Sequence, residues 1–145
     1  MNALTQPIAA GQPLAKSQHD LHNARSVLDA TLRFVRQQAQ ATDDPFVISR
    51  FGDLHIRIEV AAVLLERAED FLNSVDDDTE ISVAIAESHL ASADALNAVS
   101  NAEFELTGQR TVLTGSLHDP LHRKLHLIGN FRLNGIHPPS FRSAV

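Results

Sequence analysis

Cysteine is absent from this chain, and its absence excludes two kinds of site. With no thiol among the 145 residues, neither a disulfide framework nor a thiolate metal site can form. Long apolar runs are absent too, since no segment approaches the length of a membrane span. Residues 1–13 lack the basic start and the apolar centre of a signal peptide. We therefore expect a cytoplasmic protein with no membrane partner.

Glycine is scarce and scattered, which argues against a glycine-rich phosphate loop. The six glycines also form no Gly-x-Ser-x-Gly nucleophile elbow. Ser116 and His118 are too close in the sequence to be read as a nucleophile and its base without a third group. No acidic pair can be assigned to a cleft, as a glycosidase requires. The sequence therefore indicates none of these activities.

Basic residues are few in the body of the chain, and acidic residues are few at its end. Residues 1–107 hold seven Lys or Arg against 17 Asp or Glu, whereas residues 108–145 hold five against one. A basic end on an acidic body suggests an anionic ligand there, packing onto an acidic neighbour, or simple neutralisation of the protein's own body. Nucleic acid is not an expected partner, because the acidic body would repel the phosphate backbone.

The remaining composition is that of one small globular domain, with 43% hydrophobic and 21% charged residues. Residues 1–15 contain Pro7, Gly11 and Pro13 without periodicity, so we predict a flexible lead-in there. Residues 16–145 form the predicted helical domain. Its first helix would carry on one face Leu21, Ala24, Leu28, Thr31, Val35 and Ala39.

A second helix is predicted after the cap and proline of Asp43-Asp44-Pro45. Its apolar residues recur in alternating steps of four and three, which is typical of a straight bundle seam. They are Val47, Phe51, Leu54, Ile58, Ala61, Leu65, Ala68, Leu72 and Val75. The acidic run 76–78 is interpreted as the capped start of a third, alanine-rich helix that ends near Leu106, rather than as a calcium loop.

The fourth helix is predicted to begin with Asp119 as its cap and Pro120 at its first helical position. It would end at Asn134-Gly135, where a left-handed C-cap is favourable. His118 then lies at the mouth of a helix, a rigid place from which a side chain can face a ligand. Because every strand signal is weak, the sequence predicts an all-α fold, an antiparallel up-down four-helix bundle.

A metal site in the histidine-rich tail is not favoured. His118, His122 and His126 are spaced four apart, a spacing that can serve zinc on one helix face. However, Arg123 and Lys124 lie between them and would repel a cation. We therefore predict no metal.

The same tail resembles the closing motif of the acyl-CoA dehydrogenase superfamily, in its second C-terminal domain type. The most similar subgroup is the flavin-dependent monooxygenases of organosulfur metabolism, which includes dibenzothiophene monooxygenase and the sulfur-acquisition oxidoreductases. The matching residues are His118, Asp119, Pro120, Lys124, Gly129, Asn130, Leu133, Asn134 and Gly135. Weaker matches lie at 44–54 and 104–108, and the resemblance covers roughly residues 20 to 140.

The resemblance implies a C-terminal bundle of a flavoprotein oxidoreductase or monooxygenase that acts on an organosulfur or acyl-CoA-like substrate. His118 would be the catalytic proton donor near the flavin, since an imidazole titrates near working pH. Arg110 would meet a flavin phosphate, with Lys124 and Asn130 as further cofactor-binding residues. The cofactor would be FMN or FAD, and the family's monooxygenases receive reduced FMN from a separate flavin reductase.

Three departures from the family pattern keep an alternative open. Gly115 stands where relatives carry another histidine, the connection 109–116 is short, and we expect the family's N-terminal and β domains to be missing. The alternative is a non-catalytic helical module that has kept an oligomerisation face and lost the flavin chemistry. In either case we expect the chain alone to bind flavin poorly or not at all and to show no turnover.

A homo-oligomer, either dimer or tetramer, is expected from the third helix. Its alanine face, together with Ile81, Ile85 and Leu96, exceeds what four helices are expected to cover. An exposed apolar face of that kind usually meets a second copy.

Overall fold

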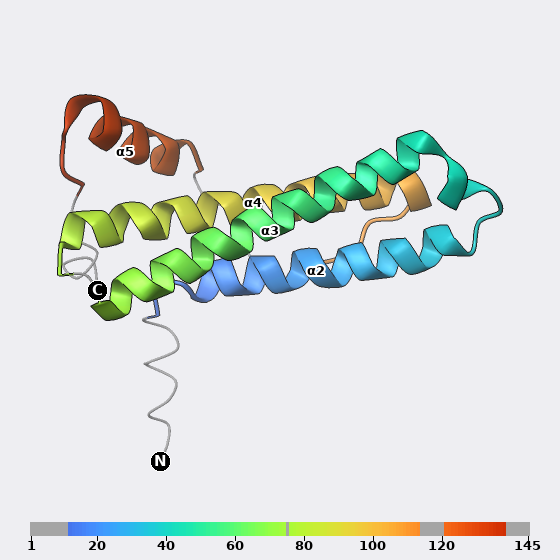
Figure 1. The fold of residues 1–145 in the computed structure, drawn as a ribbon, viewed down its shortest axis with the longest axis horizontal. Coiled ribbons are helices and arrows are strands. Elements are labelled where there is room, and N and C mark those ends of the chain that lie inside the picture. The colour runs from blue at the N-terminus through green and yellow to red at the C-terminus, as the bar shows by residue number, and fades with distance from the viewer. Residues whose placement is uncertain (1–11, 75, 114–120, 139–145) are drawn as a thin grey trace, which may run out of the picture.

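The structure, a computed structural model, describes residues 12–74, 76–113 and 121–138 (Figure 1). Across these ranges the chain forms four α-helices and one short 3-10 helix, with no strand. In chain order they are α2 (Ala15–Arg36), η1 (Ala41–Asp43), α3 (Pro45–Ser74), α4 (Asp78–Thr107) and α5 (Leu121–Asn134). The predicted all-α fold with four helices is confirmed.

The three long helices lie side by side, and consecutive ones run in opposite directions (Figure 1). Helix α4 is the central element, because it packs against α2, α3 and the shorter α5. Helix α5 lies along the N-terminal part of α4 and is tied to its first turn by His137 Nδ1, which is 3.0 Å from Thr79 Oγ1. The core therefore lies between α2, α3 and α4, and α5 is added to its outside.

Helix α3 buries the seam that its apolar period predicts. The buried side chains are Val47, Leu54, Ile58, Ala61, Leu65 and Ala68. Phe51 and Leu72 are half-buried at the ends of the same seam. Fully burying a leucine or isoleucine contributes about 1.5–3 kcal/mol, so this seam is a major source of stability.

The prediction that the third helix carries more apolar residues than the bundle can cover is wrong. Ile81, Ile85 and Leu96 are only 0%, 7% and 2% exposed. The reason is that α4 has neighbours on several sides, so apolar residues around most of its circumference are covered. Small side chains such as Ala84, Ala95 and Ala102 let those neighbours approach closely.

Both ends of α4 follow the sequence interpretation. Asp77 is the N-cap, and its Oδ1 accepts hydrogen bonds from the backbone N–H groups of Thr79 at 2.9 Å and Glu80 at 3.3 Å. At the other end Gly108 adopts a left-handed φ of 75° and closes the helix. The predicted C-cap of the last helix is also confirmed, because Gly135 has a φ of 67°.

The bundle includes residues immediately before α2. Leu14 is buried in the core, and His89 Nε2 lies 2.8 Å from the carbonyl oxygen of Pro13. Residues 1–11 of the predicted lead-in lie outside the described residues. So do Asp119 and Pro120, the predicted start of the last helix.

Candidate functional site

A short segment after α4 turns back along the bundle and is held by a buried carboxylate. Glu103 is buried, and its Oε1 accepts a hydrogen bond from the Thr111 backbone N–H at 2.7 Å. The Thr111 hydroxyl donates to the other oxygen of the same carboxylate. The Gln109 N–H donates to Thr107 Oγ1 at 3.1 Å. These bonds fix the backbone on both sides of Arg110.

Arg110 itself is anchored by neutral groups of α4. Its Nη1 donates to Ser100 Oγ at 2.9 Å and to Asn101 Oδ1 at 3.1 Å. Its guanidinium carbon lies 5.2 Å from the centre of the Phe104 ring, which is itself exposed. None of these partners is acidic. They orient the side chain of Arg110 but do not neutralise its positive charge.

The Arg110 side chain lines a surface cavity of about 410 Å³ between α3 and α4. Two other arginines line it, and both are paired with acids. Arg50 lies 3.1 Å from Glu105, and Arg57 donates to Asp53 at 3.1 Å and to Asp94 at 2.8 Å. Among the described residues, Arg110 is therefore the arginine of this cavity that has no carboxylate partner.

Hydrogen bonds to two acids further stabilise the charged form of Arg57. The bond to Asp53 and then the bond to Asp94, reinforced by the charges of both acids, raise the pKa of Arg57 above its usual value. The other two arginines of the cavity thus belong to ion pairs, and Arg110 supplies the charge that an anion would meet.

A second, apolar groove of about 530 Å³ adjoins this cavity and reaches α5. Asp94 and Asn97 line both depressions. The apolar wall of the groove consists of Leu64, Leu90, Ala91, Leu125 and Ile128. Helix α5 therefore contributes to a surface that is continuous with the Arg110 cavity.

Of the predicted site residues that the structure describes, Arg110 lines the cavity and Lys124 and Asn130 do not. His118 lies outside the described residues. Lys124 is half-buried on α5, and Asn130 accepts a hydrogen bond from Asn134 Nδ2 at 2.9 Å on the same helix. Neither residue lines the cavity beside Arg110. Their cofactor-binding roles, like that of His118, stay predictions.

Sequence reasoning missed the residues that orient Arg110. Ser100, Asn101 and Phe104 share one face of α4 by their spacing, and that spacing is a signal that could have indicated a site. The role of Glu103 could not be found in this way, because its partner Thr111 follows a reversal of the chain at Gly108.

The described residues contain neither a cluster of metal ligands nor a helix that could span a membrane. Within ranges 12–74, 76–113 and 121–138, no three or more His, Asp or Glu side chains gather as they would to hold a metal ion. Over the same part of the chain, no helix is both long and apolar enough to cross a membrane.

Comparison with known proteins identifies distant homologues. No family model matches the chain. A dibenzothiophene monooxygenase of Rhodococcus erythropolis is 29% identical over a gapped alignment of 152 positions, which covers 83% of this chain and 36% of the relative. The probable FMNH2-dependent monooxygenase SfnC of Pseudomonas putida is 24% identical over a gapped alignment of 176 positions, which covers 97% of this chain and 45% of the relative. A further dibenzothiophene monooxygenase of Rhodococcus erythropolis is 30% identical over 153 residues.

The chain is a distant homologue of proteins that are named as monooxygenases, and those names agree with the subgroup that the tail motif resembles. The chain spans 36% to 45% of the length of these relatives.

Proposed function

We propose that this chain is the helical C-terminal unit of a flavin-dependent monooxygenase, with an organosulfur or acyl-CoA-like substrate. The observation that carries this proposal is Arg110, whose exposed guanidinium lines a cavity and is oriented by hydrogen bonds to neutral groups. Support comes from relatives named as monooxygenases, one of them as FMNH2-dependent. That name favours FMN over FAD.

The described residues fit a flavin phosphate on chemical grounds. Arg110 offers N–H groups to an anion, and the exposed Phe104 ring beside it offers an apolar face. The acids of the cavity do not oppose this, because Asp94 and Glu105 are each bound to an arginine. When bound, the flavin supplies the redox chemistry. Arg110 would hold its phosphate, and Lys124 and Asn130 would add contacts from α5.

His118 would move a proton at the flavin. A histidine suits this role because its unperturbed pKa of about 6.5 lets it donate and recover a proton within one cycle near neutral pH. A separate flavin reductase would deliver the reduced cofactor, as the name of the FMNH2-dependent relative suggests.

The proposed assembly is a homo-oligomer. The exposed apolar side chains Ile56, Val60 and Val63 of α3 favour it, and they equally favour the second candidate function, a non-catalytic oligomerisation module. The two functions differ in one respect, which is whether Arg110 recognises a flavin phosphate.

Titration of the chain with FMN and with riboflavin tests that recognition, because riboflavin lacks the phosphate. This chain alone would contact FMN from one side and bury little of its surface. We therefore expect weak FMN binding, with a dissociation constant of about 1 mM or higher. Arg110→Ala should weaken FMN binding about fivefold and leave riboflavin unchanged.

Arg132→Ala is the matched control, since Arg132 also lies over an aromatic ring, 5.1 Å from the centre of Phe131 on α5. We expect this variant to bind FMN like the unmodified chain. Equal FMN affinities of the Arg110 and Arg132 variants would contradict the phosphate site and favour the non-catalytic module.

A further inference from the structure

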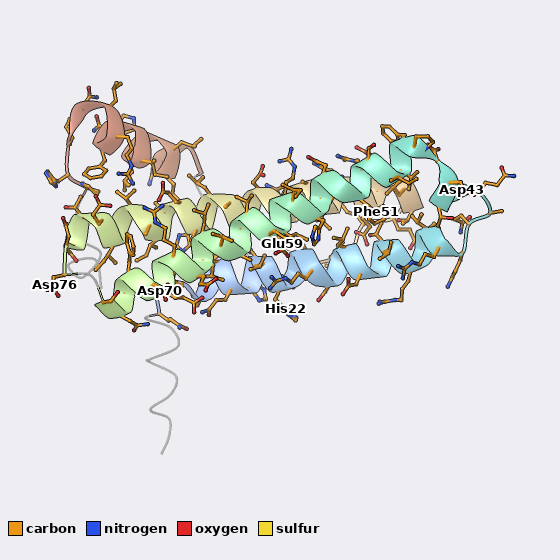
Figure 2. The ribbon with its side chains drawn as sticks, in the orientation of Figure 1. His22, Asp43, Phe51, Glu59, Asp70 and Asp76 are labelled. Carbon is orange, nitrogen blue, oxygen red and sulfur yellow. The ribbon has the colours of Figure 1, made fainter. Side chains whose placement is uncertain are left out.

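The apolar groove of about 530 Å³ takes its wall from three helices. Leu64 comes from α3, Leu90 and Ala91 from α4, and Leu125 and Ile128 from α5. The stretch of α3 that carries Leu64 lies between the labelled residues Glu59 and Asp70 (Figure 2). A depression of this volume, walled by apolar side chains from several elements, is the usual form of a small-molecule site.

The size of the groove favours a small molecule over a protein partner. Five apolar side chains form its wall. A stable protein–protein interface instead takes about 20–30 residues from each partner. Leu125 is 61% exposed, so part of the wall faces solvent and has apolar surface that a ligand would cover.

The charges that line the groove favour a neutral ligand. Two acidic residues line it, Glu87 and Asp94, and no basic side chain of the described residues does. Asp94 accepts a hydrogen bond from Arg57 at 2.8 Å, and Glu87 lies 3.7 Å from Arg67 Nη1. Each carboxylate therefore already has an arginine as its counter-charge. A cation would find no unpaired charge here, and an anion would be repelled by two carboxylates.

Glu87 has a counter-charge but lacks a hydrogen bond. Its Oε1 is buried, and no described residue donates a hydrogen bond to it. The 3.7 Å that separates this oxygen from Arg67 Nη1 exceeds the usual hydrogen-bond length of about 2.7–3.2 Å. A buried acceptor without a donor costs free energy. Because the Glu87 side chain is 23% exposed at the groove, a hydroxyl or N–H group of a ligand there would supply the missing donor.

We propose that the groove between α3, α4 and α5 binds a small neutral molecule with an apolar body and one hydrogen-bond donor, and that the Glu87 carboxylate accepts this donor. The apolar body lies against the leucines of the three helices. The site is separate from the flavin function proposed above, because Arg110 does not line the groove.

Binding of three probes with the same ring system to the full chain tests the ligand class. 2-Naphthol carries one donor and is neutral at neutral pH, since a phenol titrates at about pH 10. Naphthalene lacks the donor, and 2-naphthoate is an anion. We expect 2-naphthol to bind with a dissociation constant of about 0.1–1 mM, naphthalene about tenfold more weakly and 2-naphthoate more weakly still. Equal affinities for 2-naphthol and naphthalene would overturn the proposal.

Glu87→Met tests the acceptor, because methionine has a similar volume but no oxygen. This variant should bind 2-naphthol about tenfold more weakly and lose the preference over naphthalene, while its affinity for naphthalene stays within about threefold. Glu66→Met is the matched control, since Glu66 is exposed on α3 and does not line the groove. Loss of the preference in both variants, or in neither, would overturn the role of Glu87.

Leu125→Ser tests the place of binding. It should weaken 2-naphthol and naphthalene alike, by about fivefold, because it removes apolar surface that both probes cover. Leu133→Ser is the matched control: Leu133 is 83% exposed on α5 and does not line the groove, so its variant should bind like the unmodified chain. Circular dichroism checks that both variants keep their helix content. Unchanged affinities in Leu125→Ser would overturn the groove as the site.

A second copy of the chain is the competing occupant of the groove. Sedimentation equilibrium with and without 2-naphthol separates the two. If 2-naphthol lowers the mass of an oligomer, another copy covers the groove in solution and the small-molecule site is overturned. An unchanged mass with 2-naphthol bound supports the site. The FMN titration of Arg110→Ala gives an independent result, so the flavin function can fail while this site stands, or the reverse.

Discussion

At the residue scale, one glycine just after α4 and another inside α5 have opposite effects on stability, although a Cβ at either would meet nothing within 4 Å. Gly108 has a φ of 75° at the end of α4, a conformation that other residues adopt only with strain. Gly129 lies inside α5 with no positive φ. Conformation rather than space therefore distinguishes them.

Alanine at the two positions should change stability in opposite directions. Gly108→Ala should lower the free energy of unfolding by about 1 kcal/mol, since the left-handed region disfavours a side chain. Gly129→Ala should raise the stability of α5 by up to about 1 kcal/mol through helix propensity alone. Urea unfolding followed by circular dichroism measures the first change, and hydrogen exchange of α5 amides measures the second. A loss of α5 protection in Gly129→Ala would show that this glycine contacts something the monomer lacks.

At the scale of elements, the Arg110 cavity depends on a contact between α4 and the segment that follows it. The Glu103 carboxylate is buried beneath that segment and accepts two hydrogen bonds from Thr111. Arg110 immediately precedes Thr111 in the chain, and its side chain is held by a hydrogen bond to Ser100 of α4. The carboxylate thus acts on the site through the backbone, without touching a ligand.

Glu103→Gln should loosen this segment while keeping nearly the same side-chain volume. Replacing a charged acceptor by an amide removes a charge-assisted hydrogen bond of about 1.5–3 kcal/mol, so the Thr111 amide should exchange faster with solvent and FMN should bind more weakly. Glu105→Gln is the control, because Glu105 is exposed and pairs only at the surface with Arg50 among its described contacts. Equal exchange rates at Thr111 in the two variants would contradict the anchoring role.

At the scale of the whole molecule, the proposed chemistry needs a pocket that encloses more of the flavin than this helical unit can. The chain aligns with 36% of the dibenzothiophene monooxygenases and 45% of the SfnC protein. Activity is therefore best tested in a chimera in which this chain replaces the matching part of a relative.

In such a chimera, His118→Ala should lower turnover by about a hundredfold, the usual scale for a positioned proton donor. In the chain alone it should change the free energy of unfolding by no more than about 0.5 kcal/mol. Asp119→Ala should instead cost about 1 kcal/mol of stability, because it removes the predicted helix cap. If His118→Ala destabilised the chain as much as Asp119→Ala and left turnover intact, the histidine would be structural.

Much of the architecture could be predicted from the sequence, because the signals are local. The seam from Val47 to Leu72 repeats in steps that only a helix brings to one face, and the structure buries it. Asp77 and the glycines at 108 and 135 act on backbone groups within a few residues, so their capping roles follow from neighbouring sequence alone.

The tertiary structure alone decided which apolar faces are covered and what surrounds Arg110. Ile81 and Ile56 look alike in the sequence, yet the first is buried and the second exposed, because α4 is central and α3 is peripheral. Likewise the sequence could single out Arg110 as a candidate, but it could not show which groups bind its side chain. The neutral partners Ser100 and Asn101 reach it because the chain reverses after α4. Local capping and periodicity are properties of single segments, whereas burial and charge compensation depend on which segments become neighbours.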